Sequence, residues 1–350
     1  MPEILILIPV MFTLGLYIWW GIRFLPAERW QVFASAPAEK LADGSWRGIN
    51  YTWYGILTAN AYLVAVAVLL LLMGSVGVST TGTALLTAVM LACCVPASRL
   101  VARIVEKKAH TFTVGGAVFV GILVTPFAIR LVNATAGERL SFHIPVLAAY
   151  AAIASAYAFG EGLGRLACIS FGCCYGKPLS STSGLIRKLF EGRCLVFSGE
   201  TKKIAYADGL QGTEVLPVQA LTALFYSGCG LASAGLFLAG HFMAAFLCAT
   251  VTTQGWRSFS EVFRADYRGG GSVSAYQIMG GVGLAYAVAA SLLLSGEPVP
   301  RPEFTVGLKS LWTPAVILFL QGIWVAIFLY TGRSTVTGAT MSFHVNRENI

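Results

Sequence analysis

The chain has 350 residues, of which 56% are hydrophobic and only 11% are charged, whereas about a quarter of the residues in a typical soluble domain are charged. Residues 48–98, 215–256 and 269–296 contain no Asp, Glu, Lys or Arg, and a helix needs about 20 apolar residues to cross the hydrocarbon core of a bilayer. This composition excludes a soluble domain. It predicts an all-α integral membrane protein, a polytopic helical bundle.

About nine transmembrane helices are predicted from the apolar runs, which are bounded by charges, turns and glycines. In chain order they cover residues 4–22, 51–73, 82–98, 111–131, 143–161, 215–239, 242–258, 273–295 and 310–331. The first run follows Met-Pro-Glu instead of the Lys or Arg of a secretory signal, and the nearest small-residue cleavage pattern lies far downstream. We therefore expect the first helix to be retained.

The only long polar connection covers residues 179–213, between the fifth and sixth predicted helices. It mixes charges and glycines with alternating apolar residues, as in CLVF and IAYA. This pattern favours a small hairpin or a cap over the bilayer surface, and loops of such length in compact domains are usually functional or disordered.

The formal net charge is +8, but basic residues of a membrane protein face anionic headgroups or set topology more often than they bind nucleic acid. Assigning the loops alternately to two sides places 20 of the 24 Lys and Arg on one side, leaving Arg130, Arg139, Arg301 and Lys309 on the other. The positive-inside rule makes the basic side cytoplasmic. No nucleic-acid partner is expected.

Residues 160–178, GEGLGRLACISFGCCYGKP, place an arginine, three cysteines and five glycines at the end of an apolar run. Arg165 either snorkels to the interface or faces a cavity. The glycines would interrupt a plain transmembrane helix, so they indicate close helix packing followed by an irregular turn whose amides can meet an anion. Because irregular backbone at membrane depth needs a cavity or surrounding protein, we predict a phosphate-sized pocket beside Arg165.

Three of the eight cysteines require an explanation. Cys93, Cys94, Cys229 and Cys248 lie in apolar helices, where cysteine behaves as a small hydrophobe, and Cys194 is alone in a polar loop. Cys168, Cys173 and Cys174 lack the paired spacing of structural zinc sites and the C-x-x-C spacing of thioredoxin-like sites. No metal or cofactor is therefore expected. Small, polarizable packing at a tight turn and a reactive thiol beside Arg165 both stay open.

Further polar residues recur on the same side as Arg165. Tyr54 opens one predicted helix within TWYG, Gln219 lies one turn into another, and Glu261 and Arg264 follow a third. Several cations and hydrogen-bond donors at one depth are what a lipid headgroup site needs. His110 is either a base near this face or an interfacial histidine after a basic loop. No Ser-His-Asp arrangement or P-loop is visible.

The stretch GRLACISFGCCYGKP resembles the signature of the prolipoprotein diacylglyceryl transferase family, which runs roughly G-R-x-G-N-F-x-N-G-E-x-x-G-R-P. The matching positions are Arg165, Gly172, Gly176 and Pro178. Further pieces follow in the family's order: Trp53-Tyr54-Gly55 for W-Y-G, Ala97-Ser98-Arg99-Leu100 for G-A-R-L, Gly115-Gly116 for H-G-G, Pro217-Val218-Gln219 for H-P-T-Q, and Glu261 to Arg264 for E-x-x-R. The resemblance implies a seven-helix core at 48–296, with added segments at 1–47 and 297–350 that each hold one helix.

The sequence also departs from this family. The signature asparagine falls on Cys168, the acidic residue on Cys173, and the histidine of H-G-G on Val114. The scaffold and the arginines are thus kept, while several acid and base groups are replaced. This favours a divergent paralogue with a changed acceptor, with an authentic prolipoprotein transferase, a non-enzymatic lipid-binding or transport protein, and a thiol-based redox or metal protein as alternatives.

The resemblance implies a transfer in which a thiolate attacks the glyceryl carbon of a phosphatidylglycerol-like lipid and glycerol phosphate leaves. Arg165 and Arg264 would hold the phosphate, and Cys168, Cys173 or His110 would activate the acceptor, a thiol of a lipoprotein precursor or a small lipid. The remaining lipid-binding candidates are Tyr54, Arg99, Gly172, Gly176, Gln219 and Glu261. The implied location is the bacterial cytoplasmic membrane. The family's active face points outward, whereas the basic-residue count places Arg165 inside, so both orientations stay open.

Overall fold

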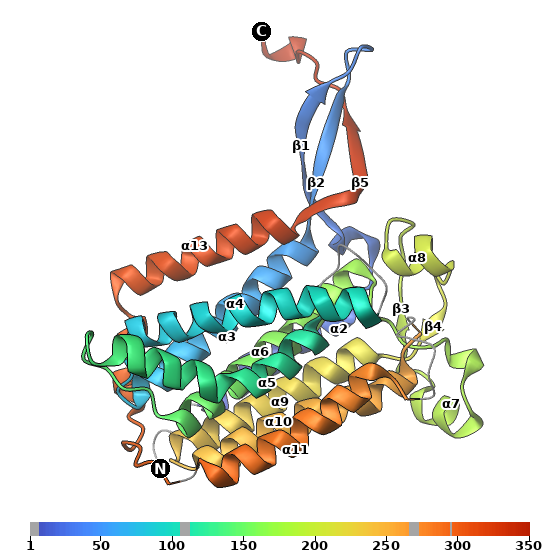
Figure 1. Cartoon of the computed structure of the whole chain (residues 1–350). Helices are drawn as coiled ribbons and strands as arrows, with labels where there is room; N and C mark the ends of the chain where they lie inside the picture. The colour runs from blue at the N-terminus through green and yellow to red at the C-terminus, as the bar shows by residue number, and fades with distance from the viewer. Residues whose placement is uncertain (1–6, 106–112, 266–272, 295) are drawn as a thin grey trace.

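In the computed structural model, residues 7–105, 113–265, 273–294 and 296–350 are described, so His110 lies outside the described residues. Nine α-helices of 18 or more residues within those ranges form a bundle (Figure 1). They are α2 (Leu7–Phe24), α3 (Trp53–Ser75), α4 (Thr80–Val105), α5 (Val114–Val132), α6 (Val146–Phe171), α9 (Val218–Leu238), α10 (Phe242–Ser260), α11 (Ala275–Leu293) and α13 (Pro314–Thr331). The prediction of a polytopic helical bundle with about nine long helices is confirmed.

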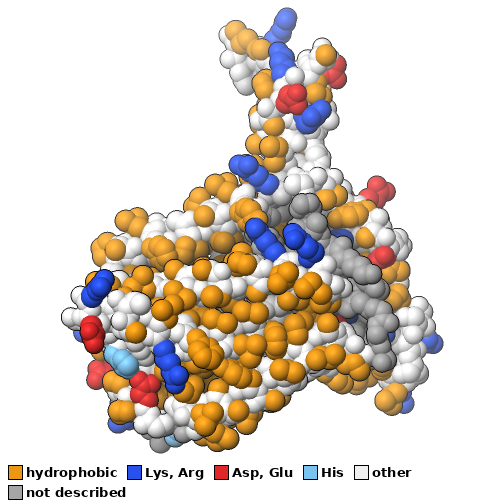
Figure 2. All heavy atoms as spheres, viewed as in Figure 1, with side chains coloured by type: hydrophobic (Ala, Val, Ile, Leu, Met, Phe, Trp, Pro, Cys, Tyr) orange, Lys and Arg blue, Asp and Glu red, His pale blue; other side chains and the backbone are white. Residues whose placement is uncertain are grey.

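Eight of these helices are long and apolar enough to cross a membrane, counted over the described residues. The ninth, α10, is more polar because Thr250, Thr253, Gln254 and Arg257 lie on its buried face. Figure 2 shows apolar side chains over the flank of the bundle, with charged side chains gathered toward its ends and on a projecting sheet. The chain is a multi-pass membrane protein.

Helix α6 forms the centre of the bundle and packs against α3, α9 and α10. Two thirds of its apolar window is buried inside the protein, because alanine and glycine along VLAAYAAIASAYAFGEGLG let the neighbouring backbones approach closely. The predicted end at residue 161 is wrong, since the helix continues to Phe171. Gly160, Gly162 and Gly164 do not interrupt the helix, whereas Gly172 ends it. A Cβ on Gly162 would lie 3.0 Å from the backbone nitrogen of Ser227 on α9.

Strands β1 (Val32–Lys40), β2 (Trp46–Thr52) and β5 (Arg333–Met341) form an antiparallel sheet in the order β1-β2-β5. The sheet projects from the bundle (Figure 1), and the sequence interpretation missed it. Thr52 N–H donates to the carbonyl of Gly332 at 2.9 Å, and a Cβ on Gly55 would lie 2.2 Å from the Gly332 Cα. Gly55 thus allows the start of α3 to contact the end of α13.

The polar connection folds at one end of the bundle, as Figure 1 shows. It contains α7 (Gly184–Phe190), α8 (Lys203–Asp208) and the strand β3 (Leu195–Val196), which pairs antiparallel with β4 (Glu214–Val215). A short antiparallel strand pair is therefore present, but α8 lies between its strands and β4 follows the predicted range 179–213. A further short helix, α12 (Phe304–Leu311), precedes α13, and single turns lie at Glu28–Trp30, Asn133–Gly137, Leu179–Ser181, Glu261–Phe263 and Arg347–Asn349.

The packing of α6 makes a matched pair of substitutions informative. Gly162→Ala would place its Cβ 2.8 Å from the Ser227 hydroxyl, whereas Gly164→Ala has its nearest neighbouring atom at 4.0 Å. Both changes raise helix propensity by about 1 kcal/mol. We expect Gly162→Ala to lose about 1–3 kcal/mol of stability through overpacking and Gly164→Ala to be neutral or stabilising, measured by thermal unfolding in detergent. Equal unfolding temperatures of the two variants would contradict this packing argument.

Candidate functional site

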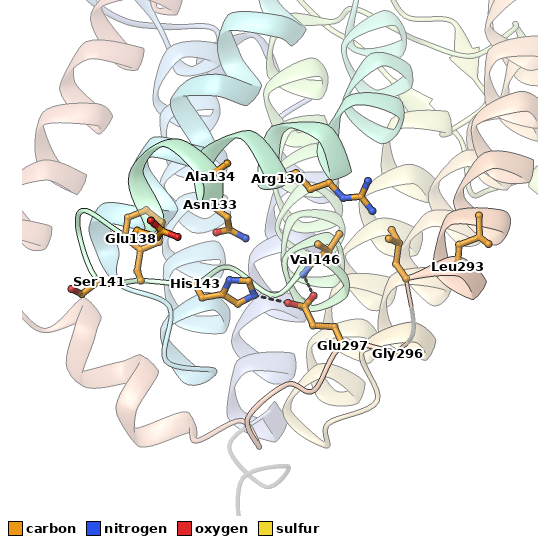
Figure 3. Close-up of a pocket in the computed structure, with 13 residues that line it drawn as sticks. Arg130, Asn133, Ala134, Glu138, Ser141, His143, Val146, Leu293, Gly296 and Glu297 are labelled. Atoms are coloured by element: carbon orange, nitrogen blue, oxygen red, sulfur yellow. Dashed lines mark hydrogen bonds and ion pairs between the residues drawn. The ribbon is translucent and has the colours of Figure 1, made fainter.

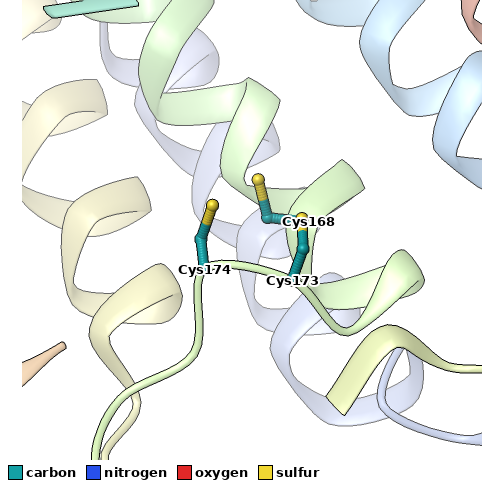
Figure 4. Close-up of side chains that lie close together, drawn as sticks. All are labelled: Cys168, Cys173 and Cys174. Carbon is teal, nitrogen blue, oxygen red and sulfur yellow. The ribbon is translucent and has the colours of Figure 1, made fainter. Parts of the chain in front are cut away.

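The end of α6 is a tight turn, residues 168–176, which we call the thiol turn. Gly172 ends the helix in the left-handed region with φ 72°, and the N–H groups of Gly172 and Cys173 donate to the Cys168 carbonyl at 2.9 and 3.0 Å. This αL ending reverses the chain after the last helical turn. As a result, the sulfur atoms of Cys168, Cys173 and Cys174 all lie within 4.8 Å of one another and point to the same side of the turn (Figure 4).

Two backbone features fix this arrangement. Cys174 has φ 58°, in the left-handed region that a non-glycine residue rarely adopts. Gly176 packs so closely that an added Cβ would lie 2.5 Å from the carbonyl oxygen of Leu216. A side chain at 176 would therefore displace the turn from the segment that enters α9.

Two neighbouring segments bring predicted site residues to the thiol turn. Gly176 forms an antiparallel bridge with Arg264, reinforced by hydrogen bonds from Lys177 N–H to the Phe263 carbonyl at 2.8 Å and from Ala265 N–H to the Tyr175 carbonyl at 3.2 Å. The buried Gln219 on α9 donates from Nε2 to the Cys173 carbonyl at 2.9 Å. The structure thus brings Arg264 and Gln219 to the cysteines, as the sequence interpretation expected.

The other candidates lie at different distances from the turn. The ring of Tyr54, on α3, lies 5.5 Å from that of Phe171, within electrostatic range of all three thiols. The Glu261 carbonyl accepts from Arg264 N–H at 3.4 Å, so Glu261 belongs to the same segment. Arg99 is exposed on α4, which packs chiefly against α5, and the described contacts do not bring it to the turn.

One turn before Cys168, charged and aromatic side chains meet inside the bundle. We call Glu161, Arg165, Tyr226 and Arg257 the arginine cluster. Arg165 Nη2 donates to Glu161 Oε1, one helical turn away, and Arg257, from α10, lies within electrostatic range of the other three. Tyr226 donates its hydroxyl to the Thr253 carbonyl at 2.7 Å. Two cations and one carboxylate therefore share a buried space.

Several polar atoms in and beside this cluster have no hydrogen-bond partner among the described residues. They are Nε of Arg165, Nε and Nη1 of Arg257, the hydroxyls of Tyr157 and Ser227, and Oε1 of Gln219. Buried polar groups are almost always hydrogen-bonded, so each exception calls for an explanation. Three of these atoms are guanidinium nitrogens, which only donate. The arrangement is suited to receive an acceptor-rich anion.

Sequence reasoning missed Arg257. It stands at the edge of a predicted apolar helix, and only the neighbouring polar run TVTTQ indicated that this end of α10 faces the interior. A Cβ on Gly115 would lie 2.5 Å from the Tyr276 ring and 3.0 Å from Arg257 Nη2. Gly115, part of the Gly-Gly pair noted in the sequence, therefore leaves room for the Arg257 guanidinium and for the Tyr276 ring beneath it, whose centroid is 5.8 Å away.

Outside the long helices, the pKa values of Cys174 and Lys202 are both shifted, for different physical reasons. Hydrogen bonds from Cys168 and Cys173, together with the charges of Arg264 and Arg165, hold the pKa of Cys174 well below its usual range. Burial lowers the pKa of the Lys202 ammonium to about 8, and Glu28 opposes this effect. Lys202 donates to the carbonyls of Leu25 at 3.2 Å and Ser170 at 2.6 Å. It thereby fastens the polar connection to the ends of α2 and α6.

One hollow on the described surface lies away from these residues. A cavity of about 980 Å³ opens at the start of α6 (Figure 3), a helix length of about 39 Å from the thiol turn. Glu297 there accepts from Val146 N–H at 2.8 Å and from His143 Nε2 at 2.6 Å. Its carboxylate thus caps the α6 N-terminus. Because these polar groups already satisfy one another, we place the functional site at the arginine cluster and thiol turn.

The fold and the site together define a multi-pass membrane protein with a buried cationic site beside a thiol turn. A family model described as prolipoprotein diacylglyceryl transferase matches residues 45–294, and the chain belongs to this family. Comparison with curated proteins gave no match. Membership makes a membrane transferase the activity class of the chain. The matched range contains the arginine cluster and the thiol turn, while α2 and α13 lie outside it.

The buried Lys202 predicts a specific pH dependence of stability. Between pH 8 and the ordinary lysine value of 10.5, the folded protein has released a proton that the unfolded chain still holds, so stability rises with pH in this window. We expect the wild type to gain stability over Lys202→Met as pH increases from 8 to 10, by up to about 1.4 kcal/mol for each pH unit. Parallel unfolding temperatures of the two proteins across this range would contradict the prediction.

Proposed function

We propose that the protein is a phospholipid-dependent transferase of the bacterial cytoplasmic membrane. It moves a diacylglyceryl moiety from a phosphatidylglycerol-like lipid to a nucleophilic acceptor. The observation that carries this proposal is the set of unpartnered guanidinium nitrogens on Arg165 and Arg257, buried inside a family scaffold that acts on lipid. Guanidinium N–H groups are the donors that phosphate oxygens accept from, and they keep their charge at all relevant pH values.

The electrostatic role of the arginine cluster follows from the charge that develops during transfer. Cleavage of the glyceryl C–O bond leaves its electron pair on a phosphate oxygen, so the phosphate gains one negative charge. Fixed guanidinium groups in a site shielded from water stabilise such a charge without reorganising. Glu161 holds one end of Arg165 and leaves Nε free to donate. Arg264 adds positive charge at the thiol turn.

The residues around the thiol turn would orient the donor lipid. Gln219 already holds the Cys173 carbonyl and keeps Oε1 for a hydroxyl donor. Tyr54 supplies a phenol at the start of α3. Gly172 and Gly176 keep the backbone close to its neighbours, and Glu261 lies on the same segment as Arg264. Arg99 stays a sequence prediction for the headgroup. His110 stays a sequence prediction for an acceptor base.

The acceptor is the part of the reaction in which this chain departs from the family signature. Cysteines stand where the signature has an amide and an acid, and Val114 stands where it has a histidine. The donor half of the site is kept and the acceptor half is changed. We therefore favour a divergent transferase over one that acts on prolipoproteins themselves.

Lysine substitutions test the donor half. Arg257→Lys and Arg165→Lys each keep a positive charge, so Glu161 still has a cationic partner at position 165. Both changes remove the planar set of guanidinium donors. We expect each to lower turnover of acyl-labelled phosphatidylglycerol by about 10²–10³-fold, with product measured by thin-layer chromatography of total lipid. We expect the loss in kcat, because the guanidinium donors mainly stabilise the negative charge that forms on the phosphate during cleavage.

Arg130→Lys is the matched control, since Arg130 is exposed at the opposite end of the bundle. It should turn over donor lipid at the wild-type rate. Folded Arg257→Lys protein with full turnover would sink the proposed role of the cluster. Copurification of anionic lipid with wild type that yields no product from any acceptor would instead make the protein a lipid-binding or transport protein.

A further inference from the structure

The spacing of the three cysteines of the thiol turn along the sequence matches no common metal-binding motif. Cys168 is on the last turn of α6, and Cys173 and Cys174 follow the left-handed Gly172. Their sulfur atoms nevertheless lie within 4.8 Å of one another, and Figure 4 shows them on the same side of the backbone. Three converging soft ligands select zinc or monovalent copper over the hard cations.

The distances between the three sulfur atoms are close to those in a zinc site. Zinc–sulfur bonds of about 2.3 Å in tetrahedral geometry separate the sulfurs by about 3.8 Å, so small side-chain rotations from the present arrangement suffice. Three protein ligands leave the fourth tetrahedral position open, which is the pattern of catalytic and not structural zinc. The turn therefore offers an incomplete shell that a substrate atom can complete.

The surrounding charge favours such a site. A zinc ion with three thiolates carries one net negative charge, and a fourth thiolate makes it two. Arg165 and Arg264 both lie within electrostatic range of Cys174, and two guanidinium groups balance that charge. Without this compensation a multiply anionic centre would be costly at the end of an apolar helix.

The turn also holds its strained shape before any ligand binds. Cys174 keeps φ 58°, which costs a non-glycine residue of order 1 kcal/mol or more and persists only where the surroundings impose it. Glycine would remove that cost. The imposed conformation directs the Cys174 sulfur toward the other two.

We propose that Cys168, Cys173 and Cys174 bind one zinc ion whose open position takes the acceptor as a thiolate. A thiol acceptor is the class that the family resemblance already implies, and this part of the inference rests on the proposed transferase function. We expected no metal because the three cysteines lack the residue spacing of known zinc motifs. That spacing does not register the left-handed turn at Gly172, which brings the three sulfurs together. Zinc would activate the acceptor in place of the acid and base groups of the family signature that are replaced in this chain.

The step balances without an oxidant or reductant. The acceptor thiol loses its proton to solvent on binding, because a coordinating thiol is deprotonated. Its sulfur attacks the glyceryl carbon that bears the phosphate ester, a C–S bond forms, and the C–O bond breaks with its electron pair on oxygen. The products are a thioether and glycerol phosphate, the latter held by the arginine cluster.

Metal content of the purified full-length protein tests the site independently of activity. We expect about one zinc per chain by mass spectrometry of acid-digested protein after equilibration with zinc and removal of loosely bound ion. Cys168→Ser, Cys173→Ser and Cys174→Gly should each lower this by more than about fivefold. Cys174→Gly is the decisive variant, since glycine accepts φ 58° and keeps the fold. Cys194→Ser and Cys94→Ser serve as matched controls that keep the metal.

Cobalt substitution tests the open position. Addition of a short cysteine peptide to the Co²⁺-loaded protein should increase the thiolate-to-cobalt charge-transfer absorption, and a serine peptide should not. With labelled phosphatidylglycerol, the zinc protein should yield the peptide thioether, and Cys174→Gly should yield at least tenfold less.

The outcomes separate the two proposals. Wild type without bound zinc, or with only monovalent copper on these cysteines, overturns the zinc site even if donor lipid is consumed. Bound zinc with no spectral response to the cysteine peptide overturns the open acceptor position. Bound zinc and a spectral response without any lipid turnover would sustain the metal site and overturn the proposed transferase function.

Discussion

The structure depends on keeping two guanidinium groups inside an apolar bundle. A buried ionised group is costly unless it is paired and hydrogen-bonded, and Arg165 meets this condition only in part, through Glu161 one turn earlier on the same helix. Arg257 meets it less, with two nitrogens unpartnered among the described atoms. The polar face of α10, the aromatic rings of Tyr226 and Tyr276, and the small residues of α6 are arranged around these charges. The fold maintains a site that its own side chains do not fully satisfy.

Much of this fold could be predicted because its strongest signals are local. Apolar runs define the helices, since a bilayer accepts little else, and the run 160–178 marks the site because glycines, cysteines and an arginine are conspicuous in such a chain. The sheet was not predictable in the same way. Strand β1, VFASAPAEK, contains a proline and alternates weakly. It pairs with the neighbouring β2, whereas the pairing of β2 with β5 joins segments near the two ends of the chain.

The parts of the site that sequence reasoning missed are set by tertiary contact. Arg257 resembles an interfacial arginine until α10 packs so that its guanidinium faces Gly115 and Tyr276. At Gly160 and Gly162 of α6, Ala65 and Ser227 fill the space that side chains would otherwise occupy. The meeting of the three thiols depends on one left-handed residue, Gly172, and one strained residue, Cys174. None of these is a property of a window of sequence.

The three thiols lie close to Arg165 and Arg264, so the charge of the thiols affects how strongly the arginines attract a phosphate. If the three thiols ionised without a cation, their charge would neutralise Arg165 and Arg264 and oppose the entry of a lipid phosphate. If they stayed protonated, they would offer no base for an acceptor. A divalent cation on the thiols removes this conflict, since it keeps them ionised while restoring most of the positive field on the phosphate side. Under the two proposals, Arg165 and Arg264 would balance the metal centre while the arginine cluster stabilises the leaving phosphate. A cysteine cluster could then stand where the family signature has an amide and an acid without loss of the cationic site.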